Sequence, residues 1–302
     1  MKKYSILFVF AAALAACSHG NYDWVGMFNG QSPDTDDRFK TSQAYNDHHG
    51  FSTRLVDDDY RVYVATDSHV DTSCYNLAQF NRAYKRDMTC PFAIHLGDLV
   101  NADGHYPLFD SAIHIVPEGY VRGKDTLFIT PGNHDLYYGQ WIQYVEYYKT
   151  GTYYFETKSK TTGKILDLFI CLDSANGTLG RLQLAWLKDL LAKAKEKGYR
   201  HIIVYTHTHV FKQDATQGHT SNYALEETYE LVGLMSQYGV ELVMMGHDHS
   251  REVTSYGGCT YIIVDSMQDP QREPYYMILS VGDKIHYDFV NEGLRPNPNG
   301  LK

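Results

Sequence analysis

The stretch VELVMMGHDH, residues 240–249, runs from a buried strand pattern directly into polar side chains. Residues 240–245 are mostly β-branched or long and apolar, which is typical of a strand covered on both faces. Gly246-His247-Asp248-His249 then supplies a turn former and side chains that can bind metal ions. Ligand sites of open α/β sheets form in loops at such strand ends.

The same transition occurs at four other places in the chain. A single His or Asp after a strand is usually a cap or turn residue, but recurrence at five strand ends indicates one shared site. The four stretches are RVYVAT (61–66) before Asp67-Ser68-His69, FAIHL (92–96) before Gly97-Asp98, TLFIT (126–130) before Pro131-Gly132-Asn133-His134-Asp135, and HIIVYT (201–206) before His207-Thr208-His209.

Segments with helical periodicity lie between these strands, which predicts an α/β fold. The segments are 73–86, 137–149, 180–197 and 223–238. Two further stretches have the pattern of β-hairpins: TYYFET to ILDLFICLDS (152–174) and YYMILSV to KIHYDFV (275–290). We expect either one mixed sheet or two sheets packed together between helices.

The N-terminus has the pattern of an export signal. Lys2 and Lys3 precede an apolar run over residues 4–16, which is shorter than the roughly 20 residues needed to span a membrane. The run ends in Leu-Ala-Ala-Cys, which resembles the lipobox of bacterial lipoproteins, so Cys17 is the expected lipidated residue. We therefore expect a lipid anchor in a bacterial envelope membrane, facing the periplasm or the surface. An ordinary secretory peptide with Cys17 as an incidental thiol is the alternative.

The composition also suggests how the rest of the chain is divided. Residues 17–50 are polar and poor in aliphatic side chains, which favours a tether or loosely packed extension with exposed His48 and His49. We expect the catalytic domain over residues 51–291 and a tail over 292–302. Cys74, Cys90, Cys171 and Cys259 are too scattered for a zinc ribbon, and no disulfide is predicted.

The formal charge limits the possible partners. It changes from -9 to -11 when Lys2 and Lys3 are removed with the signal. An acidic surface disfavours nonspecific nucleic-acid binding. A phosphate-bearing small molecule would need local positive charge, for which bound cations are the obvious source.

The order DxH, GD, GNHD, H, GHxH over residues of about 60–290 resembles the calcineurin-like metallophosphoesterase family. The resemblance implies a four-layer αββα sandwich, two divalent or trivalent metal ions, and hydrolysis of a phosphate monoester or diester by a hydroxide shared between the metals. Mn, Fe, Zn, Co and Ni all suit imidazole and carboxylate ligands. The resemblance assigns Asp67, His69 and His249 to the first metal, Asn133, His207 and His247 to the second, and Asp98 to both.

The resemblance also marks two residues of the GNHD motif as catalytic. His134 matches the histidine that protonates the leaving oxygen or stabilises its charge, and Asp135 matches the carboxylate that orients it. In the fourth motif this chain has His-Thr-His, so His209 is an auxiliary or rival ligand to His207. We expect Gly97, Gly132 and Gly246 to form tight turns.

The sequence differs from the motifs of two neighbouring subfamilies, which limits the activities that we expect. The segment GDLVNAD, residues 97–103, lacks the arginine of the protein serine/threonine phosphatases, and Asn101 replaces the iron-binding tyrosine of purple acid phosphatases. His95 is expected to be a core residue, and His105 and His219 to be surface residues. The alternative function is a lipid-anchored binding module that keeps the phosphoesterase fold without catalysis.

Overall fold

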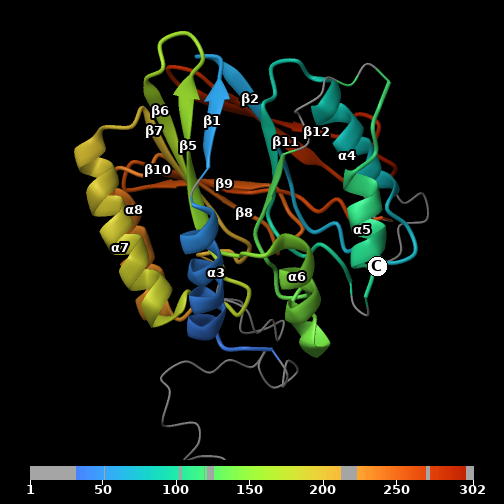
Figure 1. Cartoon of the computed structure of the whole chain (residues 1–302), viewed down its shortest axis with the longest axis horizontal. Coiled ribbons are helices and arrows are strands. Elements are labelled where there is room, and N and C mark those ends of the chain that lie inside the picture. The colour runs from blue at the N-terminus through green and yellow to red at the C-terminus, as the bar shows by residue number, and fades with distance from the viewer. Residues whose placement is uncertain are drawn as a thin grey trace, which may run out of the picture.

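The computed structural model describes residues 32–50, 52–101, 104–118, 120, 126–211, 223–269 and 273–296. Two mixed β-sheets lie face to face and helices cover both outer faces (Figure 1). The chain is thus a four-layer αββα sandwich, as the family resemblance implied. The export signal, Cys17 and His219 lie outside the described residues.

The larger sheet has seven strands, and its parallel centre holds two of the five motif-bearing strands. Its order is β1-β5-β6-β7-β8-β10-β9, and β6, β7, β8 and β10 run parallel. The predicted hairpin at 152–174 is confirmed as β5 and β6. The bounds are Thr53–Val56 (β1), Tyr153–Ser159 (β5), Ile165–Cys171 (β6), His201–Tyr205 (β7), Leu242–Met245 (β8), Glu252–Tyr256 (β9) and Cys259–Ile263 (β10).

The smaller sheet has five strands in the order β12-β11-β2-β3-β4 and carries the other three motif-bearing strands. β2, β3 and β4 run parallel, so their carboxyl ends meet at one edge. The predicted C-terminal hairpin is confirmed as β11 and β12. The bounds are Tyr60–Ala65 (β2), Phe92–His95 (β3), Leu127–Ile129 (β4), Tyr276–Val281 (β11) and Ile285–Val290 (β12).

Three apolar cores hold the four layers together. Val64, Ile94 and Phe169 belong to the core between the two sheets. Helices α4 (Tyr75–Arg86) and α5 (Tyr106–Ile113) pack on the outer face of the smaller sheet, and α7 (Gly180–Lys197) and α8 (Leu225–Tyr238) on that of the larger sheet (Figure 1). Burial of apolar side chains on both faces explains why the central strands are almost continuously hydrophobic.

The predicted helix over 137–149 is interrupted. A short 3-10 turn, η1 (Tyr137–Gly139), is followed by α6 (Trp141–Tyr148). Tyr138 breaks the regular helical conformation with a φ of 53° and a ψ of 30°. α5 was not predicted, because eight residues are too few for apolar periodicity to identify a helix.

The expectation of a loosely packed extension is wrong for residues 35–49. They form α3 (Thr35–His49), which begins after the N-cap Asp34 and packs against α7. Arg38 is fully buried and binds Asp173 after β6, with Nε 2.7 Å from Oδ2 and Nη2 3.1 Å from Oδ1. This helix was not predicted because its buried face is mostly polar, so the sequence shows no apolar periodicity there. His48 and His49 are exposed as expected.

The start of the predicted C-terminal tail packs against α4. The Arg295 N–H donates to Asn76 Oδ1 at 2.7 Å, and its guanidinium lies 3.8 Å from the centroid of the Tyr75 ring.

Cys74, Cys90, Cys171 and Cys259 are free thiols. Among the helices of the described ranges, none is long and apolar enough to cross a membrane.

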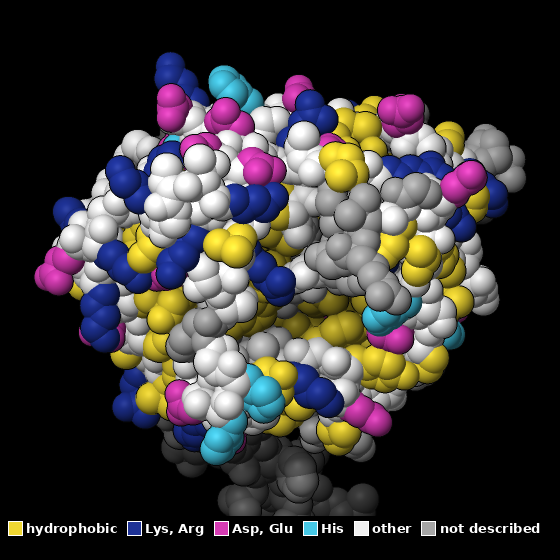
Figure 2. Space-filling model, turned by 45° about the horizontal axis from the view of Figure 1, so that its top comes forward, with side chains coloured by type: hydrophobic (Ala, Val, Ile, Leu, Met, Phe, Trp, Pro, Cys, Tyr) yellow, Lys and Arg dark blue, Asp and Glu magenta, His cyan; other side chains and the backbone are white. Residues whose placement is uncertain are grey.

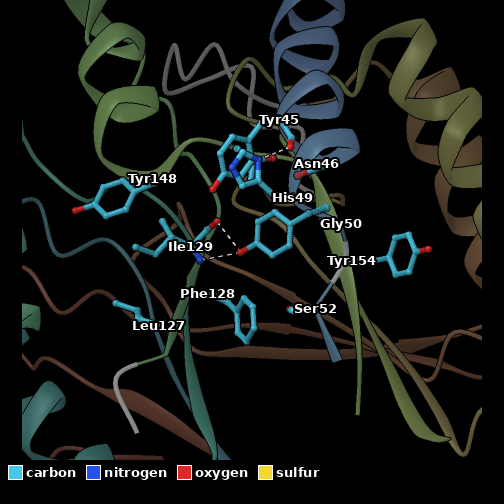
Figure 3. A pocket seen from close by; sticks show the side chains of 12 residues that line it. Tyr45, Asn46, His49, Gly50, Ser52, Leu127, Phe128, Ile129, Tyr148 and Tyr154 are labelled. Carbon is cyan, nitrogen blue, oxygen red and sulfur yellow. Dashed lines mark hydrogen bonds between the residues drawn. The ribbon is translucent and has the colours of Figure 1, made fainter. Parts of the chain in front are cut away.

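One face of the molecule carries a hollow with hydrophobic side chains on its floor (Figure 2). Lys and Arg side chains are interspersed with Asp and Glu around it. A recess of about 310 Å³ lies between the end of α3, β4 and the start of β5, where Tyr45, Phe128 and Tyr148 border it (Figure 3). None of the described residues lining this recess is a candidate metal ligand.

Candidate metal centre

The loops after β2, β3, β4, β7 and β8 bring the predicted ligands into one cluster. Three overlapping groups each have ligand atoms within 4.8 Å of one another. The groups are Asp67, His69 and His249; His69, Asp98 and His134; and Asp98, His207 and His247. His69 and Asp98 belong to two groups each, so the three groups form a single site.

Asp98 stands between the two halves of this site. Its Oδ2 lies 3.5 Å from His69 Nε2 and 3.4 Å from His207 Nε2. Its Oδ1 accepts the backbone N–H of His134 at 2.8 Å, which fixes the plane of the carboxylate. One oxygen of Asp98 therefore faces ligands of both predicted metals, as a bridging carboxylate must.

Asp67 presents an oxygen that has no hydrogen-bond partner in the described structure. Its Oδ2 accepts the Thr66 hydroxyl at 2.6 Å and the His247 N–H at 2.9 Å. Its Oδ1 is buried without a hydrogen bond and lies 3.3 Å from His249 Nε2. Buried polar atoms normally have partners, so this oxygen fits a cation ligand.

His207 and Asn133 face each other across the second half of the site. Leu96 O lies 2.8 Å from His207 Nδ1, which places the ring proton there and leaves Nε2 as the ligand atom. His207 Nε2 lies 3.0 Å from Asn133 Oδ1. The Asn133 amide in turn donates to Tyr137 Oη at 2.8 Å, which turns Oδ1 toward His207. Tyr137 was not predicted, because nothing in its sequence position distinguishes it from the other tyrosines nearby.

Five of the seven candidate ligands have a left-handed backbone although none is glycine. Such a φ is uncommon for non-glycine residues and clusters at functional sites. Hydrogen bonds between the loops hold these conformations, including Asp67 N–H to Gly97 O at 3.0 Å and Gly246 N–H to His207 O at 2.9 Å. The φ values are 49° for Asp67, 40° for His69, 53° for Asp98, 73° for His247 and 48° for His249.

Glycines allow the loops to approach the ligand carboxylates. A Cβ at Gly132 would lie 2.2 Å from Asp98 Oδ1, and one at Gly246 would lie 2.6 Å from Asp67 Oδ2. Neither glycine has a positive φ, so close approach, and not a special turn, explains both. Gly97 combines a φ of 96° with close contact, as a tight turn requires.

The two predicted catalytic residues have different surroundings. His134 Nδ1 lies 2.7 Å from Asn101 O, and the His134 ring stands 4.5 Å from the His69 ring. Asp135 accepts Gly132 N–H at 2.8 Å and the Tyr106 hydroxyl at 2.9 Å. The expectation that Asp135 orients the His134 ring therefore needs correction: the acceptor is Asn101 O, and Asp135 holds the loop in place.

The other candidate histidines lie apart from the cluster. His209 Nδ1 lies 2.8 Å from Asp248 Oδ2, and His209 belongs to none of the three groups. His95 is fully buried, with Nε2 3.1 Å from Ser68 Oγ, as expected of a core histidine. His105 Nε2 lies 3.6 Å from Asp71 Oδ1 and does not join the groups.

The site favours ionised carboxylates. Burial alone would raise the pKa of Asp98, but the nearby His207 and His134 hold it well below its usual range. Asp67 behaves in the same way because His249 offsets the effect of burial on its pKa. Burial together with His207 lowers the pKa of His247 to about 4. Ionised Asp and neutral His are the forms that bind metals, so a cation has to displace a proton from His207: burial alone would lower its pKa, but Asp98 raises it to about 9.

The residues present fit a metal centre. Carboxylate oxygens, imidazole nitrogens and an amide oxygen suit first-row transition ions. Asp67 Oδ1, which accepts no hydrogen bond, supports this fit, because a cation bound by Asp67 and His249 would satisfy it. His207 faces an acceptor at both ring nitrogens, Leu96 O and Asn133 Oδ1, and a cation at Nε2 would take the place of a proton there.

The fold and the site together define a metallophosphoesterase. The sequence profile of the calcineurin-like phosphoesterase family matches residues 60–251, which is more than half of the chain. The chain belongs to this family. No curated protein sequence matches it.

Solved structures share the fold. GAP50, described as the anchor in the inner membrane complex of Plasmodium, is 18% identical with a TM-score of 0.58, covering 77% of this chain and 84% of that chain. Purple acid phosphatase PPD1 from yellow lupin is 14% identical with a TM-score of 0.59, covering 78% of this chain and 52% of that chain. At such identities the likeness extends to the fold alone.

Proposed function

We propose that this protein hydrolyses a phosphate monoester or diester at a dinuclear metal site. The position of Asp98 carries the proposal, because its Oδ2 lies within 3.5 Å of His69 Nε2 and 3.4 Å of His207 Nε2. Membership of the calcineurin-like phosphoesterase family supports cleavage of a phosphoester. The complete set of seven ligands argues against the alternative, a binding module that keeps only the fold.

Each half of the site has its own ligands. Asp98 joins the two halves. Bound cations of the Mn, Fe, Zn, Co or Ni type supply Lewis acidity and lower the pKa of a coordinated water. The first metal is assigned to Asp67, His69 and His249, and the second to Asn133, His207 and His247.

His134 is the proposed proton donor to the leaving oxygen. The Nδ1–H group donates to Asn101 O, which fixes the ring and leaves Nε2 for the substrate. The ring lies beside His69, at the edge of the cluster. An imidazolium there can protonate an alkoxide as the ester bond breaks.

The test uses residues 18–302, reloaded with each metal, on 4-nitrophenyl phosphate and bis(4-nitrophenyl) phosphate. The ratio of the two activities decides between monoesterase and diesterase. His207→Ala and His209→Ala form a matched pair of variants. We expect the first to weaken metal binding by roughly 10- to 100-fold or more and to lose activity, while the second keeps both. Full activity in His207→Ala would contradict the assigned ligands.

We also propose that the protein is an exported lipoprotein. The Leu-Ala-Ala-Cys sequence at 14–17 after an apolar run supports this location. Mass spectrometry of the N-terminal peptide of the purified protein should find Cys17 as the first residue, carrying acyl chains. Cys17→Ser should release the protein from the membrane fraction, and an unmodified cysteine at that position would contradict the anchor.

A further inference from the structure

Tyr138 has a conformation and an exposure that its own packing does not explain. It lies in η1 with a φ of 53° and a ψ of 30°, the left-handed region that favours glycine. The residue is 70% exposed, so it gains little from burial. A residue that is both strained and exposed is a candidate for a functional role.

The ring of Tyr138 belongs to an aromatic series that begins at the candidate proton donor. The His134 and Tyr137 ring centroids lie 4.7 Å apart, and those of Tyr137 and Tyr138 lie 6.5 Å apart at 71°. Tyr137 is held by the Asn133 amide, which donates to its hydroxyl at 2.8 Å. Tyr138 therefore stands at the rim of the metal centre, on the side of His134.

This side of the centre is where the leaving group must lie. A proton donor has to approach the leaving oxygen within hydrogen-bond distance, so the alcohol part of the ester extends past His134. An exposed aromatic ring beyond the proton donor can stack on a ring carried by that alcohol. Neighbouring Tyr137 is partly buried, whereas Tyr138 is exposed, so Tyr138 offers the more accessible ring.

We propose that Tyr138 is a stacking platform that makes the enzyme prefer phosphoesters whose alcohol carries an aromatic ring. The proposal rests on the phosphoesterase function and on the role of His134. Tyr138 does not take part in bond breaking. It selects the substrate through its exposed ring at the rim.

The test compares two esters with similar leaving alcohols, 2-phenylethyl phosphate and n-butyl phosphate, or the corresponding diesters if the enzyme is a diesterase. The variants are Tyr138→Gly and Tyr138→Phe. We expect Tyr138→Gly to reduce the preference for the phenylethyl ester, as the ratio of kcat/KM, by roughly 5- to 20-fold. The loss should appear in KM, and Tyr138→Phe should restore the ratio.

A second readout separates substrate binding from a structural role. Because glycine accepts a positive φ, Tyr138→Gly should raise the melting temperature by roughly 2 °C. A fall in melting temperature, or an equal change of kcat/KM for both esters, would overturn the proposal. If the metal-loaded wild-type enzyme cleaves neither ester, the phosphoesterase function itself is contradicted; cleavage of both with an unchanged ratio in Tyr138→Gly contradicts the platform alone.

Discussion

Asp67 and Asp173 occupy equivalent positions in the sequence but have opposite surroundings. Each follows a buried strand and precedes a serine, and each is fully buried. Both carboxylate oxygens of Asp173 bind the Arg38 guanidinium, at 2.7 Å and 3.1 Å. Asp67 Oδ1, in contrast, has no hydrogen-bond partner within the described ranges.

The difference separates a structural carboxylate from a metal ligand. Burying a charge is costly unless a partner compensates it. For Asp173 the chain supplies that partner from α3. For Asp67 it supplies imidazole nitrogens, of which His249 Nε2 lies 3.3 Å from Oδ1, and neutral imidazoles can bind a cation beside the carboxylate. The comparison predicts that changes at the two sites affect different properties.

The largest effect is expected at the metal centre. Asp98→Asn keeps the shape of the side chain but removes the charge that joins the two halves of the site. We expect kcat/KM to fall by roughly 10³- to 10⁴-fold, since metal ions contribute several kcal/mol of charge stabilisation in the transition state. The urea midpoint of the metal-free protein should not decrease. Wild-type activity in Asp98→Asn would contradict the role of this carboxylate between the two halves of the site.

The next effect concerns stability alone. Arg38→Met leaves Asp173 as an unpaired buried carboxylate and should lower the free energy of unfolding by about 3–5 kcal/mol. Urea denaturation measures this loss, and metal content should stay unchanged in the folded protein. The double variant Arg38→Met/Asp173→Asn is the control, which should recover part of the stability. A loss below about 1 kcal/mol would mean that the pair is not the anchor of α3.

A smaller effect tests the proton donor. His134→Asn should reduce kcat by roughly 10²-fold for an alkyl phosphate, whose leaving group needs a proton. The reduction should be smaller for 4-nitrophenyl phosphate, because nitrophenolate leaves without one. Metal content should stay at the wild-type level. Equal losses for the two substrates would argue that His134 does not donate a proton.

The smallest effect at neutral pH comes from His95, a buried imidazole. Burial lowers its pKa to about 3 from its ordinary value near 6.5. Between these values the unfolded chain binds a proton that the folded chain does not, so stability falls as the pH decreases below 6.5. The slope is at most about 1.4 kcal/mol per pH unit. His95→Gln should remove this part of the pH dependence, and an unchanged slope in urea titrations would contradict it.

The sequence predicted those parts of the fold that have strong periodicity. The helix over residues 180–197 and both hairpins were recognisable, and the five strand ends predicted which loops meet. It did not predict α3, because Arg38, Ser42 and Asn46 form a buried face without an apolar pattern. Long-range partners, such as Asp173 for Arg38, cannot be read from spacing along the chain.

Some features of the candidate site were predicted and others were not, for a similar reason. Ligand identities follow from residue types at strand ends, and the three-dimensional positions support the assignment of His207, not His209, as the ligand. The role of Asp135 was assigned by resemblance, whereas its hydrogen bonds to Gly132 N–H and the Tyr106 hydroxyl are visible only in the structure. The left-handed backbone of the ligands has no signature in the sequence.

Counting the metal ions bound to each chain tests the central claim most directly. Native mass spectrometry of residues 18–302, loaded with Mn or Zn, should show two ions per chain for the wild-type protein. The Asp98→Asn protein should bind fewer ions, more weakly, while Arg38→Met should bind two. A wild-type protein that binds one ion or none under these conditions, yet cleaves phosphoesters at its full rate, would contradict the dinuclear site.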